Sequence, residues 1–82
     1  MLQRHSLEIA KIHVPVKRRA ALDPAKVTTI SESMLADGLK MPIQVREDGA
    51  RFVLIAGLHR LEAAKTLGQT KIDAYLVQAQ KF

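Results

Sequence analysis

The sequence predicts an α+β domain with a small mixed sheet of about four strands and two main helices. Three observations predict this class. Segments 24–37 and 58–67 carry apolar residues at helical spacing, and each is followed by a glycine that can end a helix. Short runs rich in Val and Ile lie before, between and after these two segments. The length of 82 residues suffices for one domain, which we assign to residues 1–82.

The first half of the chain is expected to form one strand and the longer helix. The run 7–14 is strand-like, and the basic segment 16–22 is expected to be an irregular connection. Asp23 can accept a hydrogen bond from the free amides of a first helical turn, and Pro24 is favoured at the first helical position. The helix should therefore begin there and end before Gly38.

The longer helix has two different faces. An apolar stripe, which should face the core, contains Val27, Ile30 and Met34. By the same period a neighbouring polar face holds Lys26, Thr29 and Ser33. This polar face is either part of a binding site or an ordinary solvated helix surface.

The second half of the chain should form a hairpin, a helix and a last strand. Strands are expected at 42–46 and 51–56, because Asp48-Gly49 between them supplies the positive φ of a hairpin turn. The second of these strands is almost continuously apolar, which indicates burial on both faces. The second helix follows it, and a final strand is expected at 71–77.

Composition narrows the function classes. The net charge of +5 favours an anionic partner, a nucleotide or a nucleic acid, although a solvated basic surface would also account for it. The absence of cysteine excludes a disulfide scaffold, a thiolate zinc site and a thiol nucleophile. The three histidines lack metal-ligand spacing, so no metal site is expected. Because no apolar run approaches ~20 residues, we expect a cytoplasmic location and no membrane partner.

The junction between the third expected strand and the second helix, Gly57-Leu58-His59-Arg60, carries the chemistry. The first amides of a helix have no internal partner, and the helix dipole is positive at that end. Gly57 lets the backbone approach an anion, and His59 and Arg60 add side-chain donors. This pattern predicts a phosphate site. The alternative is that Gly57 only makes the turn and that the two basic residues are surface residues.

The segment from Gly57 to Gly68 resembles the phosphate-binding motif of the ParB/sulfiredoxin superfamily. ParB-type members carry Gly-Glu-Arg-Arg at this point, and sulfiredoxins carry Gly-Cys-His-Arg. Further stretches match in order, and the resemblance covers roughly residues 7–78, the expected core of the domain. These stretches are Val14-Pro15, residues 22–27, residues 42–45 and residues 74–78.

The resemblance implies a site for a nucleoside triphosphate, ATP or CTP, with Mg²⁺. It implies that Gly57, Leu58, His59 and Arg60 surround the phosphates. It also implies that the polar face of the first helix, with Lys26, Thr29 and Ser33, lines the same site. Arg18 and Arg19 precede that helix, as basic residues do in the family, and would contact nucleic acid or be plain surface charge.

Two departures from the family motifs limit what carries over. Leu58 replaces the cysteine of sulfiredoxins, so reduction of a sulfinic acid by that route is excluded. Leu58 also replaces the Glu of the ParB motif and His59 its first Arg, so a preference for a pyrimidine base cannot be assumed. Complete partition proteins have a helix-turn-helix and a dimerising segment after this domain, so we expect this chain to be one domain of a longer protein.

The sequence is compatible with four functions. The first is a nucleotide-binding domain of DNA partition, plasmid maintenance or a related regulator, with slow hydrolysis supported by Arg60 and His59. The second is a DNA-binding or DNA-cleaving module without sequence specificity. The third is a serine-type kinase of small molecules with Glu8 as the catalytic base. The fourth is a domain that binds only a protein partner, and a homodimer is also open.

Overall fold

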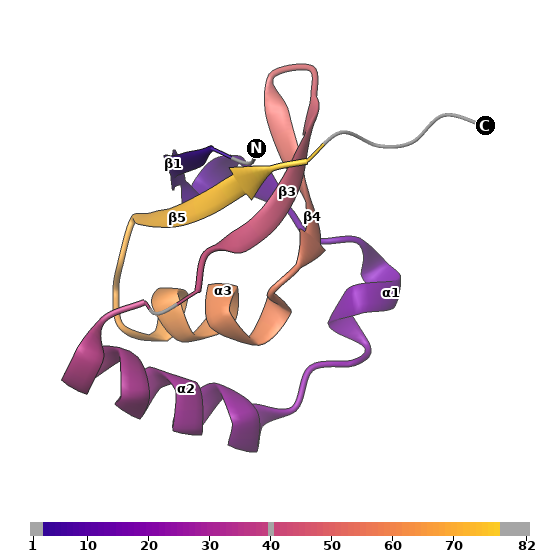
Figure 1. The fold of residues 1–82 in the computed structure, drawn as a ribbon. Helices are drawn as coiled ribbons and strands as arrows, with labels where there is room; N and C mark the ends of the chain where they lie inside the picture. The colour runs from indigo at the N-terminus through magenta and orange to yellow at the C-terminus, as the bar shows by residue number, and fades with distance from the viewer. Residues whose placement is uncertain (1–2, 40, 78–82) are drawn as a thin grey trace.

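The computed structural model describes residues 3–39 and 41–77, so the ends of the predicted domain and residue 78 of the predicted core lie outside the described residues. The elements follow one another as β1 (Arg4–Glu8), η1 (Ile9–Lys11), β2 (Ile12–His13), α1 (Val16–Arg19), α2 (Pro24–Asp37), β3 (Ile43–Asp48), β4 (Arg51–Ala56), α3 (Leu58–Thr66) and β5 (Lys71–Leu76). Here η1 is a single turn of 3₁₀ helix. Figure 1 shows α3 beneath the sheet and α2 beneath α3.

The sheet has five strands in the order β1-β5-β3-β4-β2. The pairs β1–β5 and β3–β4 are antiparallel, whereas β3–β5 and β2–β4 are parallel. The predicted α+β class with a mixed sheet is therefore confirmed. The β3–β4 hairpin turns at Gly49, whose φ of 62° is the positive value that was expected of the Asp-Gly pair.

The prediction of one strand at 7–14 is wrong, and the sheet has five strands instead of about four. The chain pairs with β5 as β1, makes the 3₁₀ turn η1, and then pairs with β4 as β2. Ile9 and Ile12 are both buried, a spacing that suits one helical turn between them. Because β1 and β2 occupy the two ends of the strand order, no straight strand could contain both.

The basic connection 16–22 is also more ordered than predicted, because its first part forms the short helix α1. The carbonyl of Pro15 accepts hydrogen bonds from the amides of Arg18 and Arg19 at 3.0 and 3.2 Å. This gives a third, four-residue helix whose side chains are all exposed.

The two longer helices begin and end close to where they were predicted. Asp23 caps α2, since its Oδ1 accepts a hydrogen bond from the amide of Ala25 at 3.0 Å. Gly38 ends α2 with a φ of 76° and donates its amide to the carbonyl of Met34. Gly68 follows Leu67, the C-cap of α3; its φ is also 76°, and it donates its amide to the carbonyl of Lys65.

The core lies between the sheet and α3 and is aliphatic. The largest fully buried side chains are Ile43, Val45, Leu54 and Leu61. The predicted stripe of α2 packs against this core: Met34 is buried, and Val27 and Ile30 are partly buried. In the part of the chain that the structure describes, none of the helices has both the length and the apolar character needed to cross a membrane.

Replacing Asp23 with alanine should lower the free energy of unfolding by about 1 kcal/mol, because the first turn of α2 loses its side-chain acceptor. Asp23→Asn is the matched control. Because asparagine also caps helices, this substitution should lower the free energy of unfolding by only about a few tenths of a kcal/mol. Urea denaturation monitored by circular dichroism measures both. Equal losses in the two variants would contradict the capping role.

Candidate functional site

Gly57 makes the turn from β4 into α3 in a conformation that other residues rarely adopt. Its φ is 104°, and a Cβ built on it would lie 2.7 Å from Cγ2 and 3.2 Å from Cα of Ile43. The fold therefore needs glycine here because the turn packs directly on the start of β3. The close approach that the structure contains is to Ile43, and the approach of an anion to Gly57 stays a prediction.

His59 joins the beginnings of the two long helices. Its Nε2 accepts a hydrogen bond of 3.0 Å from the backbone amide of Asp23, the residue that caps α2. This contact requires the neutral imidazole ring with its proton on Nδ1. His59 is the second residue of α3, so the bond brings the N-terminal turns of α2 and α3 together.

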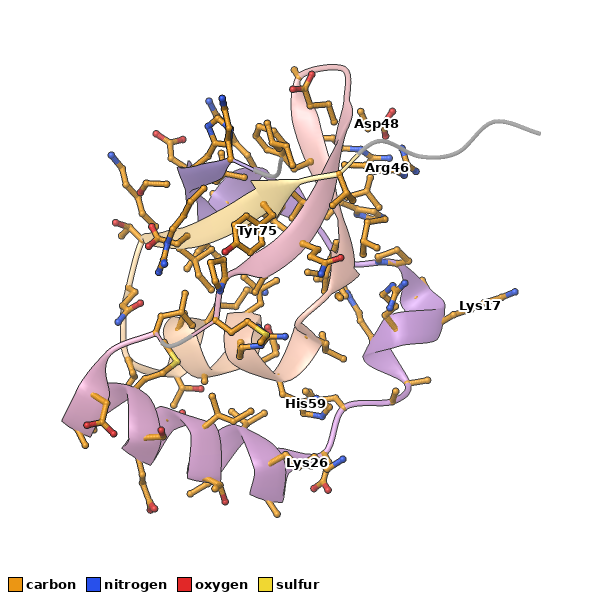
Figure 2. All side chains as sticks on the ribbon, viewed as in Figure 1. Lys17, Lys26, Arg46, Asp48, His59 and Tyr75 are labelled. Atoms are coloured by element: carbon orange, nitrogen blue, oxygen red, sulfur yellow. The ribbon has the colours of Figure 1, made fainter. Side chains whose placement is uncertain are left out.

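A hollow of about 280 Å³ opens where these two turns meet. Figure 2 shows Lys26 and His59 next to each other at this end of α2. The residues that line it are Ala25, Lys26, Thr29, Ile30 and His59. Two of the three polar residues predicted on α2 thus share a hollow with His59. Ser33 is half-buried one turn further along the helix and is not among the lining residues.

The first turns of the two helices beside this hollow carry basic residues instead of the acidic residues that usually favour a helix N-terminus. Neither α2 nor α3 has an acidic residue in its first turn; Lys26 lies there in α2, and His59 and Arg60 lie there in α3. A cation at the positive end of a helix dipole is unfavourable for the helix by itself. The Asp23 carboxylate is nearby but is engaged in capping. Two positive helix ends and the Lys26 ammonium therefore meet at this hollow, an arrangement that an anion would stabilise.

Thr29 has its hydroxyl oriented toward its own helix. Its Oγ1 donates to the carbonyl of Ala25 at 3.1 Å. A hydroxyl has one donor and two acceptor positions, so in this arrangement the donor of Thr29 is used within its own helix. Donation to a phosphate oxygen would need rotation of the hydroxyl away from the backbone.

Arg60 points toward the beginning of β3 and is not among the residues that line the hollow. Its Nη1 donates to the carbonyls of Met41 at 2.9 Å and of Pro42 at 3.0 Å. The motif predicted Arg60 as a site residue, but nothing in the sequence indicated that its side chain would donate to these two backbone carbonyls. The same is true of the Asp23 amide that contacts His59.

Three predicted site residues lie elsewhere. Glu8 ends β1, which β5 and β3 separate from β4 in the sheet, and its Oε2 lies 3.6 Å from Nζ of Lys11. Arg18 and Arg19 are exposed on α1. Arg19 lines a different hollow of about 290 Å³, together with Leu58 and four other residues. Among residues 3–39 and 41–77, no three His, Asp or Glu side chains are grouped so that they could hold a metal ion.

Comparisons with known protein sequences match nearly the whole chain. A family model described as ParB N-terminal domain matches residues 2–81. The chromosome-partitioning protein ParB of Myxococcus xanthus (strain DK1622) is 38% identical over 56 residues, 68% of this chain and 19% of that protein. The chain spans about a fifth of the length of the curated ParB relatives that it matches.

Two solved structures have the same fold. Sulfiredoxin from Arabidopsis thaliana gives a TM-score of 0.83 at 30% identity, over 94% of this chain and 86% of that chain. The second is the C-terminally truncated chromosome-partitioning protein ParB from Caulobacter crescentus, complexed with CTP-γ-S. It gives a TM-score of 0.82 at 19% identity, over 96% of this chain and 46% of that chain.

Proposed function

The chain belongs to the ParB N-terminal domain family, and on this premise we propose that it binds the phosphates of a nucleoside triphosphate, ATP or CTP. The observation that carries the proposal is the bond between His59 and the Asp23 amide. It joins the N-termini of α2 and α3 around one hollow, which Lys26 of α2 also lines. Helix N-termini with added cations are a recurrent phosphate site.

The proposed roles follow from position. Lys26 and His59 line the hollow, and Nζ of Lys26 acts as a point charge for the phosphates. The free backbone amides at the start of α3, from Leu58 onward, donate to phosphate oxygens after Gly57 has made the turn. Thr29 completes the wall of the hollow on the side of α2. Mg²⁺ would be held mainly by the phosphates themselves, as it usually is in nucleotide sites.

The base preference is the open part of the proposal. The Caulobacter relative was solved with CTP-γ-S, which supports a nucleotide as the ligand class. The present motif has Leu58 and His59 where ParB-type motifs have Glu and Arg, so CTP and ATP both stay candidates. The sulfiredoxin reaction is not proposed, because Leu58 provides no thiol.

Hydrolysis of the nucleotide is expected to be slow. Phosphoryl transfer depends mainly on positioning and charge stabilisation, which Lys26, His59 and Arg60 would supply. Glu8, the predicted base of the kinase alternative, lies on β1 with its Oε2 3.6 Å from Nζ of Lys11, and its catalytic role stays a prediction. We place the domain in DNA partition, plasmid maintenance or a related regulatory system, where a bound nucleotide acts chiefly as a switch.

An NMR titration tests this proposal. The 82-residue chain is titrated with ATP, CTP and ADP, each with and without Mg²⁺, while backbone amide shifts are followed. We expect saturable shifts at residues 23–30 and 57–60, with the tightest nucleotide identifying the base preference. The absence of shifts at millimolar nucleotide would refute the phosphate site.

The exposed cations of α1 favour a second candidate function, contact with the DNA backbone. Arg18 and Arg19 are exposed on consecutive positions, and within the described residues neither has a carboxylate within 4 Å. Binding through phosphate contacts weakens steeply with salt. Fluorescence anisotropy with duplex DNA at 50 and 200 mM salt measures this, with Arg18→Ala/Arg19→Ala as the variant. Binding that neither salt nor the double variant weakens would contradict this role.

A further inference from the structure

A groove of about 400 Å³ runs between α2 and α3, separate from the hollow beside His59. The residues of α2 that line this groove are Pro24, Val27, Thr28, Ser31, Glu32 and Leu35. They recur every three or four positions, which is the spacing of one helix face. None of them lines the hollow beside His59, so α2 presents one face to the proposed phosphate site and another to the groove.

Two exposed leucines lie at the two ends of the groove. Leu22 comes just before α2 and is 37% exposed, and Leu35 lies in the last turn of α2 and is 74% exposed. Pro24 and Val27 add apolar surface to the same wall. One exposed leucine is ordinary in a globular protein, but exposed leucines that line a groove together are typical of a protein-binding surface.

The three hydroxyl groups in the groove already use their donors. Oγ1 of Thr28, Oγ of Ser31 and Oγ1 of Thr66 donate to the carbonyls four residues earlier, at 3.2, 2.8 and 2.9 Å. An apolar partner that covers these residues would therefore leave no hydroxyl donor unpaired, and a buried unpaired donor is costly. The groove thus suits apolar side chains better than a polar ligand.

The end of the groove beside Leu35 carries a negative charge. Glu32 lines the groove one turn before Leu35 and is exposed. Within residues 3–39 and 41–77, its carboxylate has no cation within 4 Å. A partner with a basic side chain at this end would therefore complement the groove.

The opposite end, beside Leu22, carries a positive charge. A second hollow of about 290 Å³ shares Leu22 and Glu62 with the groove, and Arg19 and Lys65 also line it. Lys65 and Glu62 neutralise each other, because Nζ lies 3.0 Å from Oε2. Arg19 has no carboxylate within 4 Å in the described part of the chain, so its charge is the one that a partner meets at this end.

A second copy of this chain fills the groove poorly. Among the described residues, Leu35 is the only large apolar side chain that α2 exposes, and α1 exposes only Val16. Neither element offers a row of apolar residues that could occupy a groove of three helical turns. A partner of different sequence is therefore the better match.

We propose that this groove docks an amphipathic helix of a partner protein. Pro24 and Leu35 lie about 16 Å apart along α2, so the docked helix has about three turns, with apolar residues at i, i+3 or i+4, and i+7. Its first turn carries an acidic residue that meets Arg19, and its last turn carries a basic residue that meets Glu32. This distribution of charge also suits the dipole of the docked helix, which runs parallel to α2. The inference does not rest on nucleotide binding.

Peptide selection tests the proposal. A display library of random peptides of ~15 residues, about four helical turns, is selected against the 82-residue chain. We expect the enriched peptides to share apolar residues at helical spacing, with acidic residues before them and basic residues after them. The Glu32→Lys variant should enrich peptides with acidic residues after the apolar ones instead. No enrichment, enriched peptides without this pattern, or the same peptides from both selections would overturn the proposal.

Substitution at Leu35 locates the docked peptide. Leu35→Gln shortens the apolar wall without changing the charge, so the Kd of an enriched peptide, measured by fluorescence anisotropy, should rise about tenfold. Val16→Gln is the matched control, since Val16 is 79% exposed and lines neither the groove nor the adjoining hollow. Both residues are exposed, so both variants should keep the circular dichroism spectrum of the unsubstituted chain. Equal Kd values for the two variants would overturn docking in the groove.

Sedimentation velocity distinguishes a partner helix from a second copy. The chain should sediment as a monomer at the protein concentration used for the selection, which leaves the groove open for the partner. A dimer that Leu35→Gln dissociates and Val16→Gln does not would assign the groove to a second copy, and would overturn the proposal.

Discussion

Replacing Gly57 with alanine should lower the free energy of unfolding by about 3 kcal/mol. Two costs add. A φ of 104° is strained for any residue with a Cβ, and that Cβ would lie 2.7 Å from Cγ2 of Ile43. Domains of this size are marginally stable, so the melting temperature should fall by about 15 °C. Thermal and urea denaturation measure the change.

Gly68→Ala separates the two costs. Gly68 also has a positive φ, 76°, but a Cβ there would have no atom within 4 Å. It should therefore lose only about 1 kcal/mol, the conformational part. Ile43→Ala removes Cγ2. In a double-mutant cycle, Gly57→Ala should therefore lower the free energy of unfolding less in the Ile43→Ala background than in the unsubstituted chain. Equal losses for Gly57→Ala and Gly68→Ala would contradict the contact with Ile43.

Charge reversal at Lys26 should have the largest effect on ligand binding. Lys26→Glu replaces a cation in the first turn of α2 by an anion that would face the phosphates. We expect a loss of about 2 kcal/mol, roughly a 30-fold rise in Kd for the preferred nucleotide. The same substitution places an acidic residue at the positive end of the helix, so the fold itself should become slightly more stable. Opposite signs for binding and stability identify Lys26 as a ligand-binding residue.

Lys17→Glu is the matched control for charge. It makes the same change of two charge units at an exposed position of α1, and Figure 2 shows Lys17 extending away from the body of the domain. Its effect on nucleotide affinity should be less than threefold at 0.15 M salt, because exposed charges at a distance are screened. Calorimetric titrations of the two variants give the comparison. Equal losses would assign the effect of Lys26 to net charge alone.

Local chemistry made the helices predictable. Asp23 and Pro24 begin α2, and Gly38 and Gly68 follow the ends of α2 and α3, each by a mechanism that acts within a few residues of the chain. The hairpin turn at Gly49 was predictable for the same reason. The path from β1 to β2 was not predictable in this way. Ile9 and Ile12 are buried where the chain crosses from one edge of the sheet to the other, so their spacing does not match the alternation of a single strand.

The sequence by itself determined the α+β class, the ends of both long helices and the short list of residues at the strand-to-helix junction. Only the tertiary structure decided which of them meet. It brought Lys26 and Thr29 to His59, left Glu8 on a distant strand, and directed Nη1 of Arg60 to the carbonyls of Met41 and Pro42. Helix ends depend on side chains a few residues away, whereas the hydrogen bonds of His59 and Arg60 join a side chain to a backbone group 18 to 36 residues away. Backbone amides and carbonyls occur at nearly every position, so no sequence pattern indicates which ones a folded site will use.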